Sequence, residues 1–153
     1  MANLVTDETQ SERKRVMGLL ALAILPELVA AWKSVPDRPT VLSVRGPETG
    51  LVMVRGKTGG TGEPFNLGEV AVCRATVMIE GGPAGHAHVL GNQPEKARLA
   101  AIFDALAQVP AQADLVNDLL DRISCRVGEE RRKQAGEAAS TRVDFFTMVR
   151  GED

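Results

Sequence analysis

The chain contains few aromatic residues: four Phe, one Trp and no Tyr among 153 residues. A buried aromatic side chain removes about 150–250 Å² from water, so a core with so few of them must be built from aliphatic residues. Two of these aromatics, Phe145 and Phe146, nevertheless stand side by side close to the C-terminus. Chain ends usually fray unless contacts hold them. The position of this pair therefore predicts that residues 141–153 form an extended docking tail.

Ordering residues 143–149 of this tail costs roughly 7–14 kcal/mol of backbone entropy, and burying its apolar side chains returns roughly 7–15 kcal/mol. Because the two terms nearly cancel, the tail becomes ordered only if its backbone also pairs with a strand. That strand could belong to the chain's own sheet or to another subunit, and both alternatives stay open. The residues expected to dock are Val143, Phe145, Phe146, Met148 and Arg150.

Cysteine is also scarce. Cys73 and Cys125 lie far apart, and neither belongs to a Cys-x-x-Cys or Cys-x-x-His motif. This spacing argues against a structural zinc site and indicates a reducing compartment, which predicts a cytoplasmic chain. The sequence also lacks the Gly-x-Ser-x-Gly motif, and Cys73 falls within an apolar strand where it is expected to be part of the core. We therefore expect no catalytic residue in this chain.

The chain has no excess of positive charge: Lys and Arg number 18, Asp and Glu number 20, and the isoelectric point is about 5.7. This balance excludes a broad electrostatic attraction to nucleic acid or to an anionic membrane. An apolar run at residues 16–25 follows three basic residues, as in a signal peptide. However, Pro26 and Glu27 interrupt the run, and it is too short to span a bilayer. We interpret it as a buried helix.

Hydrophobic periodicity predicts one α+β domain over residues 1–153, with helices at 8–34, a sheet at 38–91, helices at 94–140 and the docking tail at 141–153. Gly-rich turns separate four short apolar segments, with no helix between them, which is typical of antiparallel strands. We therefore expect a small, mainly antiparallel four-stranded sheet with the N-terminal and C-terminal helices packed on one face. The expected strands are 41–44, 51–55, 70–79 and 87–90.

The expected helices carry local signals of their own. Thr9 or Ser11 could cap the first helix, with Glu12 completing a capping box. In the third helix the apolar spacing predicts one buried stripe, formed by Leu99, Ile102, Phe103 and Leu106. The fourth helix repeats this spacing up to Val127, after which Gly128 is expected to break it.

Glycine is concentrated between Gly56 and Glu69. The run that begins Gly-Lys-Thr at position 56 resembles the end of a phosphate-binding P-loop, but the preceding glycine is misplaced and no helix follows, so we reject that interpretation. A Gly-rich turn can still direct N–H groups at an anion, and the alternative is a structural hairpin loop whose glycines permit positive φ. The residues expected to contact phosphate or another subunit are Arg55, Lys57, Gly59, Gly60, Thr61, Gly62, Glu69 and Arg74.

Histidine occurs only at His86 and His88. On a strand the two imidazoles would share a face, which is an arrangement that a metal ion could use. No third ligand stands at a suitable spacing. We therefore expect two solvent-facing histidines, no metal site and no cofactor.

Several motifs together resemble the PhnG family of subunits of the bacterial carbon–phosphorus lyase complex. They are the segment 48–55, the Gly-Gly-Thr-Gly turn at 59–62, Phe-Asn-Leu-Gly-Glu at 65–69, Arg-Ala-Thr-Val at 74–77 and the closing run 138–151. The resemblance extends from residue 12 to the end of the chain. It departs at Asn92, where the family often has Arg after the glycine, so an anion contact at this position is not carried over.

The resemblance implies a subunit of a symmetric complex for phosphonate utilisation, acting with PhnH-, PhnI- and PhnL-type partners. Together these would displace adenine from ATP by methylphosphonate, giving α-D-ribose 1-methylphosphonate 5-triphosphate. The resemblance assigns the nucleosidase chemistry to the PhnI-type subunit and a later radical step to the PhnJ-type subunit with its iron–sulfur cluster. It thus implies a supporting subunit here, with a contact between two copies also open. The alternative is a direct contribution of phosphate-binding residues to a shared active site.

Overall fold

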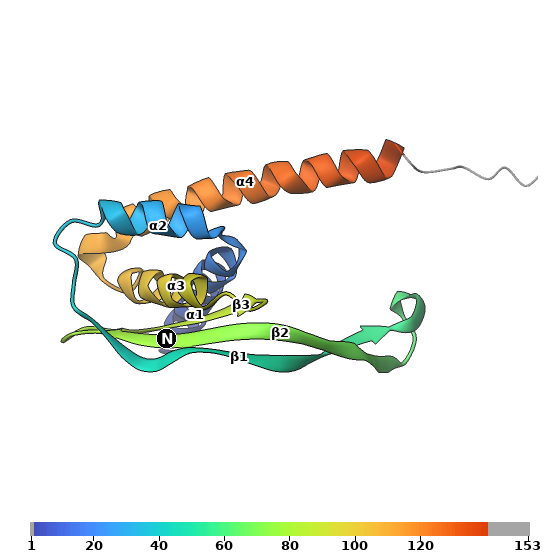
Figure 1. Ribbon diagram of the computed structural model, residues 1–153. Coiled ribbons are helices and arrows are strands. Elements are labelled where there is room, and N and C mark those ends of the chain that lie inside the picture. The colour runs from blue at the N-terminus through green and yellow to red at the C-terminus, as the bar shows by residue number, and fades with distance from the viewer. Residues whose placement is uncertain (1, 141–153) are drawn as a thin grey trace, which may run out of the picture.

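The computed structural model describes the backbone of residues 2–140 and the side chains of residues 10–59 and 61–140. It is an α+β fold, as expected, with helices before and after an antiparallel sheet (Figure 1). Two short 3₁₀ turns, Thr58–Gly60 and Pro110–Gln112, complete the described part of the chain. In order, the main elements are α1 (Ala2–Leu22), α2 (Leu25–Ser34), β1 (Val41–Lys57), β2 (Pro64–Ile79), β3 (Ala84–Leu90), α3 (Pro94–Leu106) and α4 (Ala113–Ser140).

The prediction of four strands is wrong, because the described sheet has three, in the order β1-β2-β3. The expected strands 41–44 and 51–55 are parts of one strand, β1. The expected turn around Pro47 is instead an irregularity in the pairing between Arg45 and Glu48, which face Thr76 and Arg74. An edge strand tolerates proline and a bulge, because its outer side has no ladder to complete.

All four helices lie on one side of the sheet (Figure 1). α3 is the central helix: it contacts all three strands on one side and α1, α2 and α4 on others. The expected single apolar stripe on α3 is therefore too narrow, because the helix is buried on nearly every side from Lys96 to Leu106. Small residues permit this close packing, namely Ala97, Ala100, Ala101 and Ala105.

β3 approaches α3 most closely at Gly85. A Cβ added there would lie 2.5 Å from the amide nitrogen of Ala105 and still closer to the carbonyl oxygen of Ala101. Only glycine lets the strand backbone come this near the helix backbone. The core formed around this contact includes Cys73, as the sequence predicts. Its largest fully buried apolar members are Leu20, Leu28, Val77, Val89, Ile102, Phe103, Leu106, Val116, Leu119, Leu120 and Ile123.

Two helix boundaries differ from the predictions. α1 begins at Ala2, so Thr9 and Ser11 lie inside the helix rather than at its N-terminal cap. α4 continues through Gly128 to Ser140 without a break. A glycine in a helix interior costs about 1 kcal/mol relative to alanine, which lowers stability but does not forbid the helix.

Among the described residues, no single helix is both long and apolar enough to cross a membrane. Two consecutive helix pairs meet the length and composition requirements only when joined. They are bent by 114° between α1 and α2 and by 117° between α3 and the segment that contains α4.

Candidate functional site

The distal part of the β1–β2 hairpin, residues 51–69, projects beyond the helices (Figure 1). We call it the hairpin arm. None of its described side chains is buried, whereas β2 alternates buried and exposed residues from Cys73 to Ile79. The same two strands therefore form part of the core at one end and an uncovered ribbon at the other. The exposed large apolar side chains of the arm are Leu51, Val52, Met53, Phe65 and Leu67.

The Gly-rich segment forms the tip of the hairpin arm. Its 3₁₀ turn contains Gly59 at φ 61°, a conformation that favours glycine. The Gly62 N–H donates to the Thr58 carbonyl oxygen at 2.9 Å, and a Cβ on Gly62 would lie 2.7 Å from that oxygen. Gly60 belongs to the same turn, and Thr61 follows it. The turn chemistry of these glycines therefore accounts for the shape of the tip.

The fold divides the predicted phosphate contacts: Arg55 and Lys57 lie beside the Gly-rich turn at the tip of the arm, and Arg74 lies elsewhere. Arg74 lies in the body, where its Nε is 2.7 Å from Glu48 Oε1, and Glu48 also pairs with Arg45 at 3.4 Å. Arg55 lies seven residues beyond Glu48 on β1, about 23 Å along an extended strand. Arg55 and Lys57 make no ion pair with any residue that the structure describes. Glu69 is exposed opposite Met53 on the arm.

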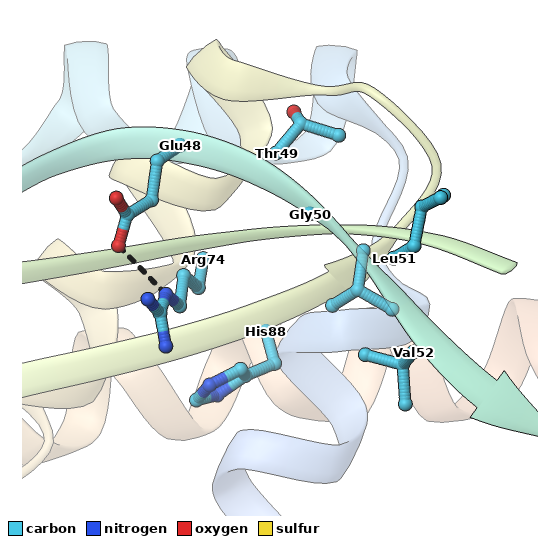
Figure 2. A pocket seen from close by; sticks show the side chains of 8 residues that line it. Glu48, Thr49, Gly50, Leu51, Val52, Arg74 and His88 are labelled. Carbon is cyan, nitrogen blue, oxygen red and sulfur yellow. Dashed lines mark hydrogen bonds and ion pairs between the residues drawn. The ribbon is translucent and has the colours of Figure 1, made fainter. Parts of the chain in front are cut away.

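A shallow pocket of about 330 Å³ lies on the sheet where the body passes into the hairpin arm. Arg74 and His88 stand between buried strand neighbours, so this polar part of the pocket lies on the open face of the sheet, the face away from the helices. Figure 2 shows Glu48 and Arg74 pointing at each other, with the His88 ring below them and Leu51 and Val52 at the other end. His86 and His88 are both exposed on this face, as the sequence predicts. Arg74 is paired with Glu48, which it shares with Arg45, so the pocket offers one imidazole, an ion-paired guanidinium and an apolar wall.

The backbone of β3 at His86 is held by Asp104, a residue that the motifs did not identify. Its carboxylate is 1% exposed and accepts the His86 backbone N–H at 2.8 Å. It also accepts two hydrogen bonds from Arg13 of α1, with Nη2 at 2.9 Å and Nε at 3.4 Å. The sequence did contain a signal for this site: Asp104 lies inside the apolar α3 segment, and a buried carboxylate needs hydrogen-bond partners.

A second set of interactions that the sequence analysis did not identify joins α4 to the α1–α2 segment through Arg126. The Arg126 guanidinium bonds the two Glu27 oxygens at 2.6 and 3.1 Å and the Leu22 carbonyl oxygen at 2.9 Å. Burial raises the pKa of Glu27, but hydrogen bonds from Arg126 and from the Ile24 N–H outweigh it and hold the pKa below its ordinary value of 4.5. Burial and the nearby Arg126 charge lower the pKa of Lys96 on α3.

Beyond this cluster, α4 extends past the body. Val127 is its last buried residue, and every residue from 129 to 140 is exposed. In Figure 1 this distal half and the hairpin arm leave the body toward the same side of the view. The expected docking residues that follow it, Val143, Phe145, Phe146, Met148 and Arg150, lie outside the described residues.

The chain belongs to the PhnG family. Residues 11–151 match the family described as "Phosphonate metabolism protein PhnG". The chain is also 55% identical, over 147 residues, to a protein of Rhizobium meliloti (strain 1021) named alpha-D-ribose 1-methylphosphonate 5-triphosphate synthase subunit PhnG. The matched region covers 96% of this chain and 94% of that relative. The family resemblance expected from the sequence is thus confirmed.

Proposed function

We propose that this chain is a subunit of α-D-ribose 1-methylphosphonate 5-triphosphate synthase, within the carbon–phosphorus lyase core complex of phosphonate catabolism. The observation that carries the proposal is the 55% identity to a subunit of that name across nearly the full length of both chains. The proposed partners are PhnH-, PhnI-, PhnJ- and PhnL-type subunits. The proposed location is the cytoplasm, because the reaction consumes ATP.

We propose a supporting role rather than a catalytic one. The polar residues expected at the site are split between the sheet body, where Arg74 pairs with Glu48, and the tip of the hairpin arm. General acid–base or nucleophilic catalysis needs partners within hydrogen-bond reach of one another. A subunit that positions a partner's active site can still be essential, since a displacement of about 1 Å can cost about 10²-fold in rate.

The test is reconstitution from separately purified subunits. With PhnI-, PhnH- and PhnL-type partners from the same operon, addition of this chain should restore methylphosphonate-dependent release of adenine from ATP. The partners alone and this chain alone should give only background release. Adenine release by this chain without partners would contradict the supporting role, and full activity of the partners without it would contradict the subunit role.

The tail is proposed to dock on a partner. A chain ending after Ser140 should fold normally but lose co-purification with the PhnI-type subunit, because it lacks Val143, Phe145, Phe146 and Met148. Exchanging only Thr147 for Ser in the full chain provides the matched control, since it keeps every apolar side chain. Unchanged co-purification of the truncated chain would show that the tail is not needed for docking.

A second candidate function is direct phosphate binding by the arm. It is favoured by Arg55 and Lys57, two cations beside a Gly-rich turn and without ion pairs in the described structure. Replacing both by Ala in the assembled complex should then raise KM for ATP. The double variant Arg45→Ala and Arg98→Ala, at exposed positions of the body, is the control that removes the same charge. Unaltered KM and kcat would exclude this function.

A further inference from the structure

The hairpin arm exposes apolar side chains on both of its faces. Leu51 pairs with Ala71, two residues before the buried Cys73, so this pair faces the helix side of the sheet. Val52 pairs with Val70, so these two share the opposite, open side. Leu51 is 67% exposed and Val52 is 51% exposed. A two-stranded ribbon is marginal in water, and contiguous exposed apolar surface marks an interaction site.

Both edges of the arm are also open. β1 has no neighbouring strand on its outer side, and β3 pairs with β2 only from Cys73 to Met78. Within the described chain, the outward backbone groups of residues 51–57 and 64–69 therefore have no strand partner. An occupant that surrounds the ribbon can bury both faces and also pair with an edge, as in strand addition.

Charge differs between the two strands of the arm. β1 carries Arg55 and Lys57, whereas the returning segment carries Glu63 and Glu69. A binding groove that matches this pattern presents carboxylates along β1 and basic groups along β2. Such complementarity fixes the direction in which the ribbon enters.

A second copy of this chain does not offer such a groove among its described residues. Outside the arm, its exposed apolar surface on the sheet includes Leu42, Met78 and Leu90 of the open face. That surface belongs to one side of a single sheet and could cover only one of the two apolar faces of the ribbon. The need to cover both faces favours a different protein.

We propose that the hairpin arm inserts into an apolar groove of a partner subunit, one that is acidic along β1 and basic along β2. This rests on the proposed function, because the partner is taken to be a subunit of the same complex. The partner's groove covers both faces of the arm. The Gly-rich turn, at the tip of the arm, enters the groove first and is called the leading end.

The experiment is co-purification of the full chain with its co-expressed partner subunits. Val52→Asp and Met53→Asp each place a charge on one face of the arm, and each should lower recovery of the partners by about tenfold or more, since an unpaired buried charge is costly. Val52→Ile and Met53→Leu keep the apolar character and should assemble as the unaltered chain does. Circular dichroism of each isolated variant should show an unchanged thermal midpoint, because both positions are exposed.

A photo-crosslinking residue at Thr61 should then join the leading end to one partner subunit. Normal recovery of the partners by both Asp variants, or crosslinking at Thr61 only to a second copy of this chain, would overturn the proposal. These outcomes are distinguishable from failure of the proposed function. In that case the unaltered chain itself would not recover the partners or restore adenine release.

Discussion

The helical body and the hairpin arm are built from the same strands but differ in what supports them. In the body, β2 buries Cys73, Ala75 and Val77 against α3. In the arm, the same strand buries no side chain between Pro64 and Glu69. The residues that stabilise the fold and the residues that remain available for binding therefore lie in different parts of the chain. The body supplies most of the free energy of folding, and the arm supplies a surface whose burial depends on another molecule.

The body should be least tolerant where β3 meets α3. Gly85→Ala places a Cβ against the backbone of Ala101 and Ala105, which neither segment can avoid by a side-chain rotation. We expect a loss of about 3 kcal/mol or more in the free energy of unfolding, measured by urea denaturation. Gly50→Ala is the control, because nothing lies within 4 Å of a Cβ added there. Equal stability of the two variants would contradict the close approach.

The next largest effect should come from Asp104. Asp104→Ala leaves the His86 N–H without its acceptor and leaves the Arg13 guanidinium with only the Ala84 carbonyl oxygen, at 3.3 Å. Loss of one partner of a buried charge pair typically costs about 3 kcal/mol, and the partial exposure of Arg13 reduces this to about 2 kcal/mol. Urea denaturation measures the loss, and the exposed Asp121→Ala serves as a control. A cost below about 0.5 kcal/mol would show that Asp104 does not hold the body together.

Acid should weaken the body through Glu27. Because its pKa is lowered in the fold, the stabilisation is fully present above the ordinary value of 4.5 and is lost as pH falls through the lower folded value. We expect Glu27→Gln to remove about 1 kcal/mol at pH 7 and to flatten the pH dependence below 4.5. Denaturation curves from pH 7 to about 3 test this expectation. The same acid dependence in both proteins would exclude Glu27 as its source.

The arm should give the smallest effects on the isolated chain. Leu51→Thr and Val52→Thr change exposed positions and should alter the free energy of unfolding by less than about 0.5 kcal/mol. Val77→Thr, a buried position on β2 in the body, should cost about 1–3 kcal/mol in the same denaturation assay. A large loss from the arm variants would mean that the arm, like the body, stabilises the fold.

The sequence predicted the helices, the antiparallel pairing and the apolar core, because periodicity and Gly-rich turns report local structure directly. It failed at Pro47, where an edge strand absorbs a turn-like segment as an irregularity. It also failed to show that Arg74 and Arg55 lie far apart. Their separation follows from the fact that residues 41–57 form one long strand instead of two short ones. Asp104 and Arg126 were missed because their partners are distant in sequence and meet only through helix packing.

Hydrogen exchange, measured on the isolated chain and on the assembled complex, distinguishes a hairpin arm that a partner covers from one that stays exposed. We expect the amides of residues 51–69 to exchange rapidly in the isolated chain and to slow by about tenfold or more on assembly, while those of α3 are strongly protected in both states. Unchanged exchange of residues 51–69 on assembly, with new protection only elsewhere, would contradict it.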